Sequence, residues 1–236
     1  MTVFSYIVFV ILPFVTIVAF LGGMLYRIRI WMKLPKPGMT LFPGGKEGTL
    51  GGVLKETLFF PGLFRADKVF WGGAWLFHVL LALIFLGHLR VFTGVIDTLL
   101  LRVFGMGAEG VNTMSATSGG AAGILIFILT LYLMFRRLTI QRVKEISSLG
   151  DYIALLLITA ILLSGNYMRF STPHFDLETT RVYFTGLFTF SSLTFPENNM
   201  FLLHFLLAQL LIIYIPFSKI LHFGGIFFSQ TLIRRA

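Results

Sequence analysis

The chain contains no cysteine. That absence excludes disulfide bonds, thiolate-ligated iron–sulfur clusters, cysteine zinc sites and covalent haem attachment through a C-x-x-C-H motif. Charged residues are also scarce, at 12% of the 236 residues, whereas hydrophobic residues make up 56% and the mean hydropathy is +0.88. These values lie far from those of soluble globular domains and predict an integral membrane protein. If such a protein handles electrons, its redox centre must be held non-covalently by ligands other than cysteine.

Five apolar runs are long enough to cross a bilayer, which takes roughly 20 residues. We therefore expect an all-α integral membrane protein of one domain, residues 1–236, in which five transmembrane helices form a bundle. The spans are predicted at residues 4–26, 69–93, 118–135, 152–170 and 200–222. A sixth apolar stretch, Tyr183 to Phe195, is short and rich in Thr, Ser and Gly, so we expect an interfacial or re-entrant segment there.

The formal net charge of +9 has a simpler source than nucleic-acid binding. No basic stripe with interleaved aromatic residues is present, so nucleic acid is not an expected partner. Fifteen of the 19 Lys and Arg residues fall on one side of the expected spans and four on the other. By the positive-inside rule, the N-terminus is predicted to lie outside and the C-terminus in the cytoplasm of a multi-pass cell-membrane protein.

The segment 31–68 joins the first two spans on the predicted cytoplasmic side. It is dense in Pro and Gly at "LPKPGMTLFPGGKEGTLGG" and continues with "VLKETLFF", which looks amphipathic. Two explanations are open: a docking loop for a cytoplasmic partner, or an interfacial loop that rests on lipid.

Four of the five histidines lie within two of the expected spans, His78 and His88 in the second and His204 and His222 in the fifth. Ionisable side chains at membrane depth are rare and by default mark functional sites. Because the two spans run in opposite directions, His78 should meet His222 near the cytoplasm and His88 should meet His204 near the outside. The sequence thus predicts two histidine pairs at two heights.

The spacing of the histidines differs between the two spans. Ten residues of helix rise about 15 Å, whereas eighteen rise about 27 Å. The difference can be absorbed by unequal helix tilts, by a kink at Pro216, or by a fifth helix that is already ending where His222 lies.

Histidines that approach from opposite helices suit a haem, whose iron takes one axial ligand on each face. Two pairs predict two haem b groups stacked across the membrane. The alternative is a transporter without haem, in which the histidines form interhelical hydrogen bonds or relay protons. Such a relay usually calls for acidic residues within the spans, and almost none is present. A zinc site is less favoured, because no further carboxylate or thiol stands at ligand distance.

Several stretches resemble the gamma-subunit family of respiratory nitrate reductases, which are dihaem cytochromes b. These are "FLGHLR" from Phe85, "SGGAAGILIF" from Ser118, "RRLTIQRVKEISSLGDYIALLL" from Arg136 and "IPFSKILHFGG" from Ile215. A further stretch, "FFPGLFRADKVFWGGAWLFHVLLALIFLGH" from Phe59, is more similar to the DsrM-like branch of Dsr and Hme complexes and to membrane-bound heterodisulfide reductase.

The resemblance implies a quinol-oxidising electron-transfer subunit of a multi-subunit respiratory oxidoreductase. Menaquinol would be oxidised near the outer face, and electrons would pass through two b haems to a cytoplasmic iron–sulfur subunit of heterodisulfide-reductase type, in sulfur or sulfite respiration. Further membrane or outer-face redox subunits are implied as partners. The alternative within the family is the gamma subunit of a nitrate reductase.

The family's haem ligands carry over to four positions of this chain. His78 and His222 match the ligands of the inner haem, and His88 and His204 match those of the outer haem. Nitrate reductase members also bear a lysine before the third span that is thought to serve the quinol pocket. This chain departs from that pattern, because no Lys or Arg lies between Arg102 and Arg136.

Haem propionates need cationic partners near the ends of the spans. The candidates are Lys219, Arg136 and Arg137 for the inner haem and Arg90 and Arg169 for the outer haem. Each of them also fits an ordinary membrane anchor that snorkels to lipid phosphate. The quinol-site candidates are Gly87, His88, Tyr6, Asn112 and Asp97. No side chain is assigned a catalytic role, because haem and quinol carry the redox chemistry themselves.

Overall fold

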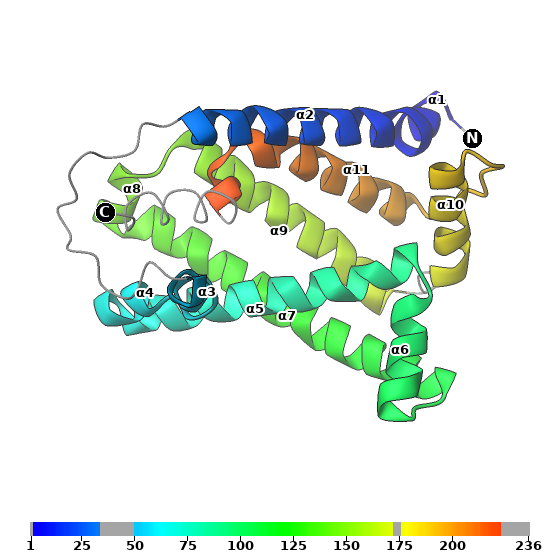
Figure 1. Cartoon of the computed structure of the whole chain (residues 1–236), viewed down its shortest axis with the longest axis horizontal. Coiled ribbons are helices and arrows are strands. Elements are labelled where there is room, and N and C mark those ends of the chain that lie inside the picture. Colours follow the sequence, from blue (N-terminus) through cyan, green and yellow to red (C-terminus); the bar gives the residue numbers. More distant parts are fainter. Residues whose placement is uncertain (1, 34–49, 172–175, 223–236) are drawn as a thin grey trace.

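The computed structural model describes residues 2–33, 50–171 and 176–222, and these ranges fold into helices joined by short turns (Figure 1). The segment 34–49, which holds most of the Pro/Gly-rich part of the expected docking loop 31–68, and His174 lie outside the described residues. The helices are α1 (Val3–Tyr6), a π-helical turn (Ile7–Ile11), α2 (Leu12–Lys33), α3 (Leu50–Phe59), α4 (Pro61–Ala66), α5 (Lys68–Phe92), α6 (Val95–Phe104), α7 (Ala108–Thr139), α8 (Gln141–Glu145), α9 (Leu149–Phe170), α10 (Leu177–Thr189) and α11 (Asn199–Tyr214), followed by 3₁₀ turns at Ile215–Phe217 and Lys219–Leu221.

The described residues include five helical segments long and apolar enough to cross a membrane, which confirms the expected number. They are Val3–Lys33, Lys68–Phe92, Ala108–Thr139, Leu149–Phe170 and Asn199–Phe217. The third begins ten residues before its expected start, because the polar stretch from Ala108 continues the helix beyond the apolar run. The fifth ends five residues before its expected end. Which end faces the cytoplasm stays a prediction.

The five long helices form a chain of neighbours. α5 packs on α7, α7 on α9, α9 on α11, and α11 on α2 (Figure 1). We call the end of this bundle at α6 and α10 the α10 end, and the opposite end, at α4 and α8, the α8 end. α10 is a 13-residue helix packed on α5 at the α10 end. It is too short to span a membrane, as expected for the sixth apolar stretch.

Polar side chains set the points at which the long helices begin. The Asp67 carboxylate accepts the backbone N–H of Phe70 at the start of α5, and Ser148 and Asp151 form a reciprocal capping box at the start of α9. Asn198 accepts two backbone N–H groups at the start of α11. These caps satisfy amide groups that would otherwise lack partners near the membrane surface.

The end of α11 is broken at Pro216. Its α-helix stops at Tyr214, a 3₁₀ turn follows, and Ser218 takes an extended conformation (φ −121°, ψ 171°) before the second 3₁₀ turn. The α-helix therefore covers ten residues after His204, the same number that separates His78 from His88. The remaining eight residues return His222 to the level of His78, so the mismatch between the two spacings disappears.

The first span contains a π-helical turn whose free carbonyls are used by neighbouring helices. The Tyr183 hydroxyl donates to the Phe9 carbonyl at 2.5 Å, and the Gln209 amide donates to the Val8 carbonyl at 3.2 Å. A π-turn leaves carbonyl groups without their usual i+4 partner, so these buried donors stabilise it. The contacts tie the π-helical turn of the first span to α10 and α11.

Glycine at position 23 is required by the close approach of α2 to the break in α11. A Cβ added there would lie 2.6 Å from Cβ of Pro216, whereas a Cβ at Gly22 would meet no atom within 4 Å. We expect Gly23→Ala to lower the free energy of unfolding by about 1–3 kcal/mol through overpacking. Gly22→Ala, the matched control, should leave it unchanged or raise it by about 0.5–1 kcal/mol.

Thermal unfolding of the detergent-purified variants measures this difference. Equal unfolding temperatures for the two alanine variants would show that α2 does not contact the break closely.

Candidate functional site

The structure brings His78 of α5 and His222 together nearer the α8 end. Their ring centroids are 5.8 Å apart and the ring planes are nearly perpendicular, at 88°. His78 is half-buried and His222 is exposed.

The second pair, His88 of α5 and His204 of α11, lies nearer the α10 end. Its ring centroids are 6.2 Å apart and its ring planes are nearly parallel, at 12°. The structure therefore brings all four membrane histidines together in two pairs at two heights. The pairs match the topological argument, whereas their role as metal ligands stays a prediction.

Each of the four imidazoles has its Nδ1 atom engaged by a backbone carbonyl. The Nδ1–oxygen pairs are His78 with Ala74 at 2.7 Å, His88 with Ile84 at 2.7 Å, His204 with Ile161 at 3.1 Å, and His222 with Lys219 at 3.0 Å. A carbonyl only accepts, so Nδ1 must carry the proton in every ring. The lone pair then belongs to Nε2, which is the arrangement of a metal-ligating histidine held by an outer hydrogen bond.

The donor set fits haem better than a bare metal ion. Within the described residues, no group of three or more His, Cys, Asp or Glu side chains gathers at one point. A two-imidazole set suits an iron that already holds four porphyrin nitrogens, whereas zinc takes three or four protein ligands. With metal–nitrogen bonds of about 2 Å, two axial imidazoles have ring centroids roughly 6 Å apart. Both observed separations, 5.8 and 6.2 Å, agree with that spacing.

The packing of the helices leaves the two histidine-bearing elements apart. α5 packs mainly on α7, and α11 packs mainly on α9 and α2, while α5 and α11 have almost no close backbone approach among the described residues. Their contact is made by the imidazoles that face each other. This separation is what a flat cofactor between two helices requires.

Small residues of α9 support His204. The Ser164 hydroxyl lies 2.9 Å from its Nδ1, and a Cβ at Gly165 would lie 3.2 Å from the His204 ring. Gly165 therefore lets the ring lie against the backbone of α9. Sequence reasoning missed both residues, although the Ser-Gly pair inside an apolar span was a visible signal of close helix contact.

At the α8 end, the three candidate cations already have partners. Lys219 Nζ lies 2.7 Å from Asp151 Oδ2, and Arg137 lies 3.5 Å from the same oxygen. Arg136 is 3.3 Å from Asp67, and its guanidinium lies 3.9 Å from the Phe70 ring centre. The Lys219 side chain is 66% exposed, so it has the most freedom to turn to another anion.

A cavity of about 660 Å³ opens beside His222 at the α8 end. The described residues that line it come from α2, the start of α9 and the broken end of α11: Arg27, Trp31, Ser148, Gly150, Asp151, Tyr214, Phe217, Ser218, Lys219, Leu221 and His222. Arg27 donates from Nε to the Pro216 carbonyl at 2.7 Å. Arg27 and Lys219 are thus two cations that line this cavity. In the sequence, Arg27 was counted only as a positive charge near the membrane surface.

At the α10 end, four polar side chains form one network. The Arg90 guanidinium pairs with Asp97 and donates to Asn112 Oδ1 at 2.8 Å, while Arg181 lies 2.9 Å from the other Asp97 oxygen and donates twice to the Arg90 carbonyl. Burial favours a raised pKa for the Asp97 carboxyl, but hydrogen bonds from Arg90 and Arg181 outweigh it and hold the pKa below its usual range.

This network changes the interpretation of three candidates. Asp97 and Asn112 were expected near a quinol, and Arg90 near a propionate, yet the structure uses them to join α5, α6, α7 and α10. A carboxylate shared by two guanidinium groups is a poor proton acceptor near neutral pH. Arg181, which sequence reasoning did not single out, completes the network.

Three other candidates lie elsewhere. Arg169 is exposed and lies one helical turn beyond Gly165 on the same face of α9, near Gly119, and no ion pair of Arg169 is present in the described part of the chain. A Cβ at Gly87 would meet no atom within 4 Å, so the surface beside His88 is open. Tyr6 of α1 is 50% exposed.

Comparison with known proteins identifies the family of this chain. The family model described as "Nitrate reductase gamma subunit" matches residues 62–235, which include all four histidines. The chain belongs to this family. The resemblance noted in the sequence is thereby confirmed.

Two curated relatives of this family member share a more specific name. "Hdr-like menaquinol oxidoreductase cytochrome b-like subunit" of Archaeoglobus fulgidus is 30% identical to the chain, and the match covers 94% of the chain and 77% of the relative. The protein of the same name from Archaeoglobus profundus is 27% identical, over 95% of the chain and 77% of the relative.

The Asp97 network gives a pH-dependent prediction for this family member. The pKa of Asp97 is lower in the folded state than in the unfolded state. The ionised carboxylate therefore contributes its full stabilisation when the pH is above the unfolded-state pKa. This stabilisation is lost as the pH falls through the folded-state pKa. Asp97→Asn should lower the free energy of unfolding by about 1–3 kcal/mol at pH 7. The difference from the unsubstituted chain should shrink below pH of about 4.

Denaturant unfolding in detergent between a pH of about 2 and a pH of about 8 measures this effect. Glu178→Gln is the matched control, because Glu178 pairs with the same Arg181 at 3.3 Å but is 77% exposed. The Glu178→Gln substitution should change the free energy of unfolding by no more than about 0.5 kcal/mol. If both variants behave alike at pH 7, the network does not hold the α10 end together.

Proposed function

We propose that this chain is the membrane cytochrome b subunit of a menaquinol oxidoreductase. In this proposal the His78–His222 and His88–His204 pairs would each hold a b haem. The bound haems would supply the route for electrons from menaquinol near the α10 end to a cytoplasmic iron–sulfur subunit of heterodisulfide-reductase type at the α8 end. The complex would serve sulfur or sulfite respiration and would include further membrane or outer-face redox subunits.

The single observation that carries this proposal is the state of the four imidazoles. The four rings meet in two pairs between α5 and the α11 segment, and a backbone carbonyl engages Nδ1 in each, so the lone pair of every ring belongs to Nε2. The names of the relatives supply the class of electron donor and partner.

The side chains around the pairs orient the ligands rather than react. Ser164 and the Ile161 carbonyl direct His204, while the carbonyls one turn back on α5 direct His78 and His88. Arg169, without a carboxylate partner in the described part of the chain, is the best placed cation for an outer propionate. Lys219 and Arg27 face the cavity beside His222 and suit an inner propionate.

The proton-relay alternative is disfavoured by the same hydrogen bonds. A histidine relay accepts a proton at one ring nitrogen and releases one from the other, so both nitrogens must be free to exchange. Here Nδ1 is bound to a carbonyl in every ring. A relay would therefore have to break the contact that orients each imidazole.

Within the family, the nitrate reductase alternative remains the second candidate. The matching family model carries the name of the nitrate reductase gamma subunit, and that match favours it. Two observations favour the heterodisulfide-reductase-like branch instead: both relatives bear that name, and the chain lacks a Lys or Arg between Arg102 and Arg136. Identification of the cytoplasmic protein that co-purifies with the chain decides between them.

Haem content tests the proposal directly. Dithionite-reduced minus oxidised spectra and extracted haem should give two b haems per chain. His78→Ala and His88→Ala should each lose one haem, and they should lose different ones. His174→Ala is the matched control, since it removes the fifth histidine of the chain and should retain both. Absence of haem from the purified chain would refute the proposal.

The two pairs should also differ in their magnetic spectra. A ferric haem with perpendicular axial imidazole planes gives a more anisotropic low-spin signal than one with parallel planes. Since the ring planes meet at 88° in one pair and 12° in the other, oxidised membranes should show two distinct low-spin signals. His78→Ala should remove the more anisotropic signal and His204→Ala the other. Two identical signals would contradict the observed ring orientations.

A further inference from the structure

The turn between α3 and α4 is built around a residue in a sterically costly conformation. Phe60 has φ 49° and ψ 48°, in the left-handed region that residues with a Cβ rarely adopt. Only Phe60 and Phe190 do so among the non-glycine residues that the structure describes. Phe60 precedes Pro61, and a residue before proline avoids the right-handed helical region, so α3 cannot continue straight into α4.

Two indole groups of α5 hold this turn in place. Trp71 Nε1 donates to the Phe59 carbonyl at 2.7 Å, and Trp75 Nε1 donates to the Leu58 carbonyl at 2.9 Å. These are the last carbonyls of α3, which have no partner within their own helix. The two indoles lie 5.8 Å apart on one face of α5. A strained backbone conformation that surrounding side chains hold in place is commonly found at a functional site.

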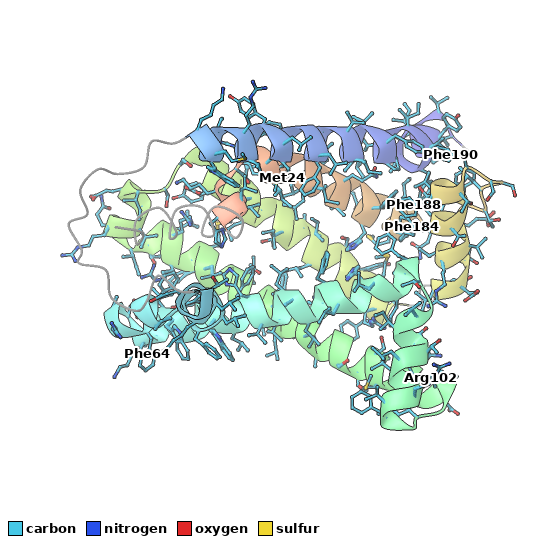
Figure 2. The ribbon with its side chains drawn as sticks, in the orientation of Figure 1. Met24, Phe64, Arg102, Phe184, Phe188 and Phe190 are labelled. Atoms are coloured by element: carbon cyan, nitrogen blue, oxygen red, sulfur yellow. The ribbon has the colours of Figure 1, made fainter. Side chains whose placement is uncertain are left out.

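The turn directs the Phe60 ring at one of the paired histidines. Its centroid lies 5.2 Å from that of His78, edge-on at 79°, and Phe77 contacts the same imidazole at 5.4 Å and 83°. Phe60 itself is half-buried, as His78 is. Figure 2 places the neighbouring Phe64 at the same end of the molecule, far from Phe190.

We infer that Phe60 is a positioning residue for His78, with Trp71 and Trp75 holding its strained backbone so that the ring orients the His78 imidazole and limits the access of water to it. This inference rests on the proposed haem function. It goes beyond that function by assigning a task to the α3–α4 turn, which no ligand assignment includes. A change of the Phe60 backbone to an ordinary conformation would move the ring away from His78.

The expected consequence follows from the charge on iron. An apolar cover disfavours the ferric haem, whose iron–porphyrin core bears one positive charge, relative to the ferrous haem, whose core is neutral. Loss of the Phe60 ring should let water approach and stabilise the ferric form. The reduction potential of the inner haem should then fall, whereas that of the outer haem should not change.

The test uses Phe60→Gly in the full complex, because glycine adopts the left-handed conformation without strain and should preserve the turn. Optical redox titration should show that the equilibrium constant for electron sharing between the two haems shifts by up to about tenfold toward the outer haem. For a one-electron couple, that factor corresponds to a fall of about 59 mV in the reduction potential of the inner haem. The more anisotropic low-spin signal should also change. Phe60→Tyr keeps a ring at this position and should restore both properties.

Phe190→Gly is the matched control. Phe190 has φ 55°, and its ring is 82% exposed and stacks on Phe14 at the α10 end. It should leave both haems unchanged. An unaltered inner haem in Phe60→Gly would overturn the inference, and so would an equal change of both haems, which would indicate a general folding role. Absence of haem from the unsubstituted chain would instead refute the proposed function itself.

Discussion

An imidazole in a hydrocarbon layer has two nitrogens that both need partners, and this requirement governs the arrangement of the whole bundle. Backbone carbonyls satisfy Nδ1 in all four membrane histidines, and in three of them the carbonyl belongs to the histidine's own helix or turn. Nε2 is left to face the opposite element. The helices are spaced accordingly, since α5 and α11 are held apart by α7 and α9 while the rings meet across the space between them.

The break in α11 at Pro216 brings His222 to the same height in the bundle as His78. A continuous α-helix from His204 to His222 would place the second ring about 12 Å too far along the axis, given 1.5 Å per residue and eight extra residues. The helix stops at Tyr214, and the 3₁₀ turns return the chain toward α5. Gly23 of α2 has no side chain and so lets Pro216 pack closely against the helix, and Arg27 donates a hydrogen bond to the Pro216 carbonyl. The first span, which carries no haem-ligand candidate, therefore supports the position of His222.

Carboxylates at the two ends are each shared between cations and also fix helices. Asp151 begins α9 and pairs with Lys219 and Arg137, while Asp97 joins Arg90 and Arg181. Most of the positive charges that the sequence offers for propionates are thus partly neutralised by the protein. Arg169 and Arg27 are exceptions, because no ion pair of either is present in the described part of the chain, and Arg27 lines the cavity beside His222. Only their surroundings distinguish them.

The sequence by itself determined the five apolar spans and singled out the four histidines that the structure brings together, because hydropathy and residue order can be read directly from the chain. It also predicted the pairing, since opposite helix directions leave one match by height. It could not determine where α11 ends, because proline permits a kink or a stop, and contacts with Gly23 decide between them. Nor could it show that Asp97 and Asn112 serve Arg90, or that Phe60 reaches His78. Those contacts join residues from separate elements, so the packing of the helices decided them.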